Sequence, residues 1–300
     1  MTDRKIALIG AQMGWGAQKH ETEWGAAHLQ AQKLEHALQV QGLDIQSFSQ
    51  IKVQQPYIAN QPTLDKKAKL NNIIDFNERL ASRLAQTIAA DIFPVVIGGD
   101  HSIAMGTWSG VVDALDAYED FALIWVDAHL DAHTPETSLS HAIHGMPVAH
   151  LLGLGERKLA ELLDRRPKIK PENFIYLGIR SFEQAEIDLI RSLGIRVYDI
   201  KEINAKGFKA IFKEVVESLS RQVSHFGLTI DLDAFDPSDA PGVGSPEENG
   251  LFKKDVLPAL RSLAKNPQLA AVEIAEFNPT LDVQNKTQQL INEILIEIFK

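Results

Sequence analysis

Short apolar runs alternate with longer amphipathic stretches along this chain of 300 residues, and this alternation limits the possible folds more than any other feature. The runs expected to form strands are residues 5–11, 93–99, 121–129, 173–180, 195–200, 226–235 and 269–277, with 42–48 as a weaker candidate. Strands that alternate with helices are typical of a parallel sheet that helices cover on both faces. The sequence therefore predicts an α/β fold.

The amphipathic stretches between these runs have the spacing of helices. The clearest lies at 71–92, and others lie at 183–193, 208–223, 254–264 and 287–299. The Gln-rich segment at 50–61 is predicted to form a surface loop. Because we find no internal repeat, low-complexity tract or composition shift that would mark a linker, we expect a single domain over residues 1–300.

Composition excludes several classes of protein. The net charge of −10 argues against a nucleic-acid partner, since that kind of binding depends on clustered Lys and Arg. The chain has no Cys, which rules out disulfides, thiolate metal ligands and a Cys nucleophile. The apolar run near the N-terminus is too short for a signal sequence or a membrane span, so we expect a cytoplasmic protein without a membrane partner.

Four of the apolar runs end in acids or histidines. The segment "GGDHS" follows "FPVVI", "DAHLD" follows "FALIWV", "DLD" follows "FGLTI", and Glu276 follows "LAAVEIA". Ligands of open parallel sheets bind outside the carboxyl ends of the strands, so these groups are expected to share one site. Residues two apart in an extended chain point the same way, so each segment is able to present several ligands together.

The acids and histidines of these segments form a candidate set of metal ligands. The set is His101, Asp127, His129, Asp131, Asp231 and Asp233. Two imidazoles and four carboxylates exceed what one cation needs and suit two divalent cations roughly 3.5–4 Å apart. Oxygen-rich ligation without sulfur favours Mn²⁺ over Zn²⁺. A Gly-Gly turn or an Asp-x-His pair taken alone is more often a turn or solvated coil, and their convergence at strand ends favours the metal site.

Five segments of the chain resemble the ureohydrolases, the family of arginase, agmatinase and their relatives. These segments are "GGDHS", "DAHLDAHTPETS", "IHGMP", "DLDAFDPSDAPGVGSPEENG" and "EIAEFNP". The resemblance runs from about Lys5 to the C-terminus. It implies a three-layer αβα fold with a mostly parallel sheet of about eight strands, two Mn²⁺ per chain, and a homo-oligomer that is a trimer or a hexamer.

The resemblance also implies a division of the ligands between the two metals. One ion would be held by His101, Asp127, Asp131 and Asp231. The other would be held by Asp127, His129, Asp231 and Asp233, so that Asp127 and Asp231 bridge the pair.

Three residues have implied catalytic roles. Two cations keep a bridging hydroxide deprotonated near neutral pH, and Asp131 would orient this nucleophile. The family's Glu at the position of Glu276 pairs with the substrate guanidinium. His144, in "IHGMP", matches a proton shuttle, for which an imidazole suits because its pKa lies near operating pH. Without the motif, His144 would be taken as a structural loop histidine.

The residues that would meet an amino-acid head group differ in part from those of arginases. His133 stands where arginases typically carry an Asn that contacts the α-carboxylate, and Ser140 matches their Ser. Glu183 and Glu186 match the acids that bind the α-amino group, with Glu183 in place of Asp, and Ser245 stands where the family usually has Thr. These differences bear on the substrate and leave the metal ligands intact.

The sequence favours hydrolysis of L-arginine to L-ornithine and urea by a metal-bridging hydroxide, with a small cationic guanidino compound as the substrate. One alternative is an amidinohydrolase for agmatine or a guanidino acid such as guanidinobutyrate. Another is a non-catalytic metal-binding scaffold on the same fold. The retention of both His144 and Glu276 argues against the scaffold, because a protein without activity has no need for them.

Overall fold

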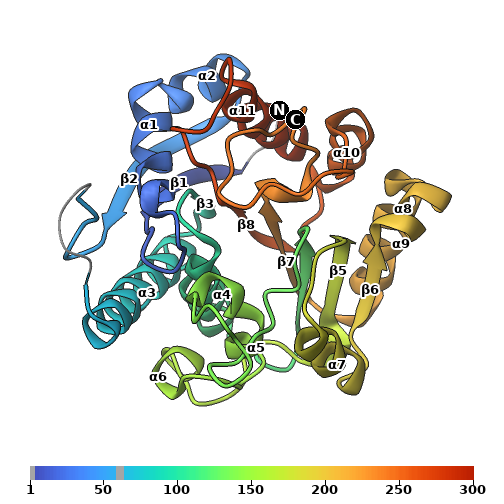
Figure 1. Cartoon of the computed structure of the whole chain (residues 1–300). Coiled ribbons are helices and arrows are strands. Elements are labelled where there is room, and N and C mark those ends of the chain that lie inside the picture. Colours follow the sequence, from blue (N-terminus) through green and yellow to red (C-terminus); the bar gives the residue numbers. More distant parts are fainter. Residues whose placement is uncertain (1–3, 59–63) are drawn as a thin grey trace.

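The computed structural model describes residues 4–58 and 64–300 and is built around one eight-stranded sheet (Figure 1). The strands are β1 (Lys5–Gln12), β2 (Asp44–Lys52), β3 (Phe93–Ile97), β4 (Phe121–Val126), β5 (Phe174–Ile179), β6 (Arg196–Asp199), β7 (His225–Asp231) and β8 (Leu269–Ala275). Their order across the sheet is β2-β1-β3-β8-β7-β4-β5-β6, and neighbouring strands pair in parallel throughout. The predicted α/β fold with about eight parallel strands is confirmed.

Helices cover both faces of the sheet and divide the core into two parts. One part packs under α1 (Gly25–Ala31), α2 (Leu34–Val40), α8 (Ile200–Lys206), α9 (Phe208–Gln222), α10 (Lys253–Leu260) and α11 (Lys286–Phe299). The other packs under α3 (Lys66–Ala89), α4 (Ala104–Ala114), α5 (Pro147–Leu151), α6 (Arg157–Ala160) and α7 (Gln184–Ser192). None of the helices within the described ranges is long and apolar enough to cross a membrane.

The continuous apolar run of β4 follows from this two-sided burial. Ile124 and Val126 point into one part of the core, and Leu123 and Trp125 point into the other. Successive side chains of a strand lie on opposite faces, so a central parallel strand needs apolar residues at every position.

The structure corrects several element boundaries. Residues 50–52 of the predicted Gln-rich loop belong to β2, and residues 59–63 of that loop lie outside the described residues. The predicted helix at 254–264 is α10 followed by a separate 3₁₀ turn at Arg261–Leu263. The predicted strands at 121–129 and 226–235 end at Val126 and Asp231, where the chain leaves the sheet.

Helix α4 was absent from the predicted elements because it is buried all around and therefore lacks an apolar stripe. It packs closely against α3, and Gly106 and Gly110 make this approach possible. A Cβ atom added at Gly110 would lie 2.4 Å from the carbonyl oxygen of Ala81, and one at Gly106 would lie 2.8 Å from that of Asn77.

The four strands whose ends carry the candidate site residues are neighbours at the centre of the sheet. Their order is β3-β8-β7-β4, although β3 and β4 are consecutive in the chain and β7 and β8 come much later. This arrangement brings all four carboxyl ends to one place.

Candidate metal centre and active-site pocket

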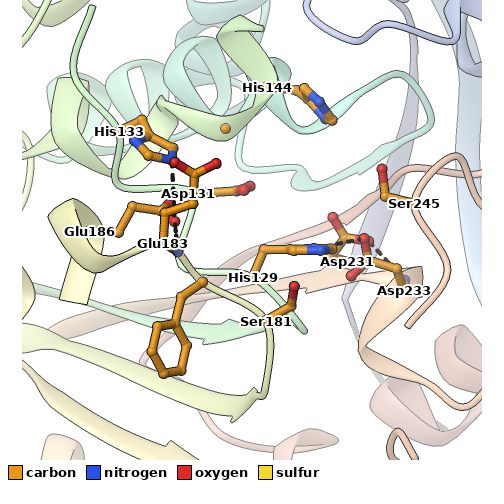
Figure 2. A pocket seen from close by; sticks show the side chains of 12 residues that line it. His129, Asp131, His133, His144, Ser181, Glu183, Glu186, Asp231, Asp233 and Ser245 are labelled. Atoms are coloured by element: carbon orange, nitrogen blue, oxygen red, sulfur yellow. Dashed lines mark hydrogen bonds and ion pairs between the residues drawn. The ribbon is translucent and has the colours of Figure 1, made fainter. Parts of the chain in front are cut away.

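A cavity of about 250 Å³ opens at the carboxyl ends of the central strands (Figure 2). Most of its lining consists of residues that the sequence predicted for the site. They are His129, Asp131, His133, His144, Glu183, Glu186, Asp231, Asp233 and Ser245, joined by Gly145, Ser181 and Phe182. Acidic groups predominate in this lining, so the cavity suits a cationic ligand.

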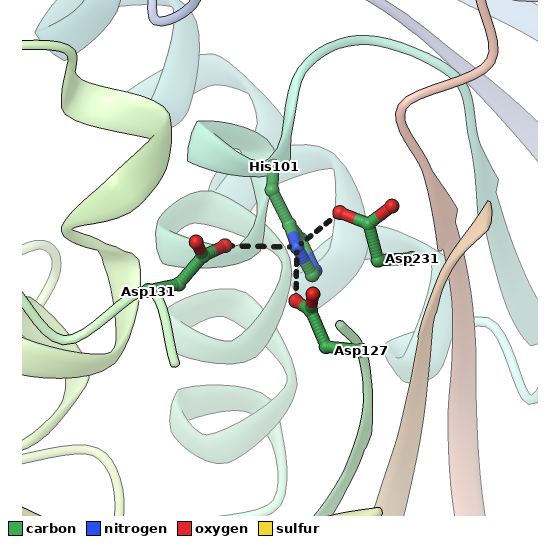
Figure 3. A group of neighbouring side chains, drawn as sticks. All are labelled: His101, Asp127, Asp131 and Asp231. Carbon is green, nitrogen blue, oxygen red and sulfur yellow. Dashed lines mark ion pairs between the residues drawn. The ribbon is translucent and has the colours of Figure 1, made fainter. Parts of the chain in front are cut away.

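His101 and three aspartates form one group of ligand atoms (Figure 3). The Nδ1 atom of His101 lies 3.2 Å from an oxygen of Asp127, 3.1 Å from one of Asp131 and 3.0 Å from one of Asp231. All four ligand atoms lie within 4.8 Å of one another. A ring nitrogen carries at most one proton, so at least two of the three carboxylate oxygens around it receive no hydrogen bond from the ring. A cation between these oxygens would balance their negative charge.

The far side of the His101 ring supports this assignment. Its Nε2 atom lies 3.2 Å from the hydroxyl of Thr229, and that hydroxyl donates to the buried Glu273 carboxylate at 2.7 Å. With its own proton given to Glu273, the hydroxyl accepts from Nε2, so a neutral His101 ring would carry its lone pair on Nδ1, facing the three carboxylates. Within residues 4–58 and 64–300, the Nδ1 atom has no well-directed hydrogen bond, as expected of a ring nitrogen that is free to bind a metal ion.

A second group consists of Asp127, His129 and Asp233. The Nδ1 atom of His129 lies 3.1 Å from Asp233 Oδ2 and 3.7 Å from Asp127 Oδ1. Asp127 belongs to both groups, as a bridging ligand would. Asp231 falls in the first group alone, so its bridging role stays a prediction.

The charges of the two groups show why cations fit there. Burial and then the nearby charges of Asp233 and Asp127 raise the pKa of Asp231 well above its ordinary value. Burial and the charge of Asp127 raise the pKa of Asp131 to about 7. For Asp127, burial alone would raise the pKa, but the nearby ring nitrogens and the positive charges of His101 and His129, which are protonated when no ion is bound, hold it low. Divalent ions would relieve the repulsion that these acids otherwise experience.

The Gly-Gly pair before His101 is required by close packing. Both glycines have positive φ values, 94° at Gly98 and 79° at Gly99. A Cβ atom would lie 2.9 Å from Ala26 in the first case and 2.7 Å from the carbonyl oxygen of Ala11 in the second. Only glycine fits this turn, which brings His101 to the sheet centre.

Asp100 is a buried residue of the site that sequence reasoning did not single out. Its carboxylate accepts hydrogen bonds from the backbone N–H groups of Gly16 at 2.8 Å and Ala17 at 3.2 Å. The carbonyl of Gly16 in turn accepts from the backbone N–H of His144 at 3.1 Å. Asp100 therefore ties the N-terminal loop to the metal strand and to the His144 turn. Its position inside "GGDHS" was the available signal.

His144 and Glu276 form an ion pair at the cavity wall, with Nδ1 and Oε1 3.0 Å apart. The same oxygen of Glu276 accepts from the backbone N–H of His101 at 2.9 Å. Burial alone would lower the pKa of His144, but the bond and charge of Glu276, with Asp131 and Asp100, raise it to about 9.

The backbone is strained at two of the site acids. Asp131 has a φ of 48° and Glu276 one of 66°, both in the left-handed region that non-glycine residues seldom adopt. The Glu276 N–H donates to the carbonyl of Gly99 at 2.8 Å, and the carbonyl of Asp131 accepts from Val148 at 3.0 Å. Such strain persists where surrounding contacts enforce it, and it concentrates at functional sites.

His133 packs against the two glutamates at the other end of the cavity. Its Nε2 atom lies 3.3 Å from Glu186 Oε2 and 3.6 Å from Glu183 Oε2, and its Nδ1 atom lies 3.1 Å from the hydroxyl of Thr137. Glu186 also accepts from the backbone N–H of Ala132 at 3.1 Å. Both ring nitrogens of His133 thus have partners within the protein.

A second hollow of about 220 Å³ adjoins the first, and His144 and Ser245 line both. Ser140 and Glu276 line the second hollow alone. Lys19 lies there too, and its ammonium donates to a backbone carbonyl at 2.7 Å. Lys19 was not among the residues predicted from sequence, because no motif in the N-terminal segment marks it.

Comparisons with known proteins agree with this geometry. The arginase family model matches residues 4–300. The arginase of Bacillus subtilis strain 168 is 36% identical over 293 residues, which cover 98% of this chain and 97% of that protein. The solved arginase of Bacillus caldovelox superposes with a TM-score of 0.90 at 34% identity, covering 99% of this chain and 98% of that one.

A more distant structure also has this fold. The arginase of Entamoeba histolytica, solved in complex with L-ornithine, has a TM-score of 0.89 at 27% identity and covers 100% of this chain and 99% of that one. The match of the family model over nearly the whole chain, with these relatives, shows that this protein is an amidinohydrolase that belongs to the arginase family.

Proposed function

We propose that this protein is an arginase that uses two manganese ions to hydrolyse L-arginine to L-ornithine and urea. The observation that carries the proposal is the pair of ligand groups that share Asp127 beneath an acid-lined cavity. The relatives described as arginases support the choice of reaction. We further propose that the chain is a single domain that acts in the cytoplasm as a homo-oligomer.

The first group would hold one ion through His101, Asp127, Asp131 and Asp231, and Asp127, His129 and Asp233 would hold the other, with Asp231 as the second bridge. When bound, the two ions supply Lewis-acid activation of water at neutral pH.

Asp131 and Glu276 position the two reacting partners. Asp131 lies on the cavity wall, where its carboxylate is able to accept a hydrogen bond from the attacking water and so direct its lone pair. Glu276 is a buried carboxylate at the border of the second hollow and pairs with the guanidinium of the substrate.

His144 serves as the proton carrier. In the free protein its imidazole is held protonated by Glu276. A guanidinium that pairs with Glu276 takes over part of this negative charge, which lowers the pKa of His144 toward neutrality. His144 is then able to donate a proton to the leaving amine, which departs as the amino group of ornithine.

Five residues would recognise the amino-acid head group, four by contact with it and one by holding two of the others. Glu183 and Glu186 offer carboxylates to the α-ammonium group. Ser140 and Ser245 offer hydroxyl groups to the α-carboxylate, and His133 orients the acids through its contacts with them.

One observation favours agmatine as a second candidate substrate. Both ring nitrogens of His133 already have partners, so this ring has no free N–H to donate to a carboxylate. The 250 Å³ cavity therefore offers carboxylates to a cationic group more readily than it offers hydrogen-bond donors to an anionic group. Agmatine carries no carboxylate, and its ammonium group would suit the same acids.

A urea-release assay with added Mn²⁺ on arginine, agmatine and guanidinobutyrate tests the proposal. The expected result is turnover with a kcat/KM for arginine on the order of 10³-fold above that for agmatine, since each polar group that substrate binding buries without a partner costs about 1–3 kcal/mol and two or three would lack one. A preference for agmatine would refute the arginase assignment and retain an amidinohydrolase. If none of the three compounds released urea, the non-catalytic metal-binding scaffold would be the remaining alternative.

A further inference from the structure

The side chain of Arg180 follows β5 and joins two loops at the edge of the metal centre. Its guanidinium donates to the carbonyl oxygens of Asp233 at 2.7 Å and Ala234 at 3.1 Å. It also donates to those of Glu247 at 2.9 Å and Glu248 at 3.2 Å. The first two belong to the turn after β7, and the last two to a loop that follows it. The Arg180 side chain thus holds together two segments that are separate in the sequence.

Both segments carry an acid that faces His129. Asp233 Oδ2 lies 3.1 Å from His129 Nδ1, and Glu247 Oε1 lies 3.5 Å from His129 Nε2. The backbone of Arg180 also contributes, because its N–H donates to the carbonyl of Ala128, beside His129, at 2.9 Å. Arg180 therefore bonds to the main chain of Asp233 and Glu247 themselves and to the main chain of Ala128, which precedes His129.

The planar guanidinium suits this task because its five N–H groups point in fixed directions. Lysine has three donors on a flexible stem and would keep only part of the bonds. The chain uses Arg180 to fix backbone positions, since the bonds described above all run to carbonyl oxygens.

We propose that Arg180 is a positioning residue for the second ligand group, and that it sets the affinity of one of the two metal ions by holding Asp233 and Glu247 on either side of His129. This inference rests on the two-metal function proposed above.

The Arg180 side chain bonds to no residue of the first ligand group, and its link to that group is indirect, through the Asp233 N–H that donates to Asp231 at 2.8 Å. His101 is fixed by the turn after β3, and Asp231 ends β7, where the sheet register pairs it with Ala275 of β8. Neither position depends on the guanidinium. Loss of Arg180 therefore affects one ion more than the other, whereas a general loss of structure would weaken both.

The fold should survive a change at Arg180. Two main-chain bonds tie the same segments together without it, from Leu251 N–H to the Ala234 carbonyl and from Asp236 N–H to the Leu251 carbonyl, both at 2.9 Å. Arg180→Met keeps the aliphatic stem and removes the donors. Arg180→Lys restores a cation with fewer donors.

Calorimetric titration of the metal-free protein with MnCl₂, together with elemental analysis after desalting, tests the proposal. We expect wild type to bind two ions per chain. In Arg180→Met, one of the two dissociation constants should rise about 10- to 100-fold, the usual effect of removing a group that orients a metal ligand. The other should change by less than about threefold, and Arg180→Lys should lie between Arg180→Met and wild type.

Lys168 provides a matched control. It is a buried cation whose ammonium donates to the carbonyls of Ala160, Asp164 and Arg166, far from the ligands in sequence and without a contact to them among the described residues. Lys168→Met should lower the thermal midpoint of the metal-free protein and leave both manganese affinities as in wild type.

The outcomes separate this inference from the proposed function. Equal weakening of both ions, or two wild-type affinities in any folded Arg180 variant, overturns the positioning role and leaves the two-metal function standing. Binding of fewer than two ions by wild type overturns the proposed function and this inference with it. Should Arg180→Met fail to fold, Arg180→Lys alone decides.

Discussion

Replacing Glu276 by glutamine would remove the negative partner of His144 and keep the size of the side chain. In the folded protein the pKa of His144 is raised from the ordinary 6.5 to about 9. At about 1.4 kcal/mol per pKa unit, this rise corresponds to roughly 3 kcal/mol of net preference for the charged ring. The preference is net of burial, which acts in the opposite direction, so the pair itself contributes more.

In Glu276→Gln, burial remains and the largest attraction on His144 is lost, which leaves only the weaker attractions of Asp131 and Asp100. The pKa of His144 should therefore fall by at least about two units, to its ordinary value or below. NMR titration of ring-labelled histidine in the metal-free protein would measure this, and His144→Asn would assign the resonance. A His144 pKa that stays within half a unit of the wild-type value would refute the ion pair as the cause.

The same pair predicts how stability depends on pH. The folded protein holds the His144 proton more tightly than the unfolded chain, so the contribution is complete below pH 6.5 and is lost as pH rises through about 9. Urea unfolding of the metal-free protein at pH 6 and pH 9.5 should show a larger loss of stability in wild type than in Glu276→Gln. Parallel losses in the two proteins would contradict the reasoning.

Four further outcomes are expected. Asp127→Ala should abolish nearly all turnover and lower metal content, because Asp127 belongs to both ligand groups, and elemental analysis with urea release checks this. His144→Asn should lower turnover by roughly 10²-fold with normal metal content, since general acid–base catalysis contributes at least that much. His133→Ala combined with Ser140→Ala should raise the KM for arginine more than that for agmatine in steady-state assays. Glu23→Gln should stabilise the protein more at pH 8 than at pH 5 in urea unfolding, because burial raises the pKa of Glu23 to about 7 and the wild type loses stability as pH rises through that value.

The ends of the central strands were predictable from sequence because two physical signals coincide there. An apolar run long enough for a buried strand stops, and groups that are costly to bury unpaired begin at once, as with Val126 and Asp127. The structure brings His101, Asp127 and Asp231 together as these signals indicated. A parallel sheet places such ends on one edge, and the strand order β3-β8-β7-β4 makes these four ends neighbours on that edge.

Strand order, helix α4 and the support around the ligands were beyond the reach of sequence patterns. Periodicity reports which face of an element is apolar, and α4 has no polar face to report. The side chain of Arg180 bonds to backbone carbonyls, which every residue has, so the identity of its partner residues gives no signal in the sequence. The contact of His133 with Glu186 depends on where α7 begins relative to the metal loop, a tertiary relation that neither segment reveals alone.

The insertion of β8 between β3 and β7 has a consequence for synthesis of the protein. A ribosome releases β3, β4 and β7 before β8, so the emerging chain exposes two sheet edges that later become neighbours of the last strand. The carboxylate of Glu276 reaches the backbone of His101 across 175 positions of sequence, and such distant closure is slow. Until it occurs, the incomplete sheet is open to pairing with other chains, and the acids of the centre lack the wall that carries Glu276. Because β8 separates β3, which precedes His101, from β7, which ends in Asp231, the complete set of proposed metal ligands would come together only after β8 has paired.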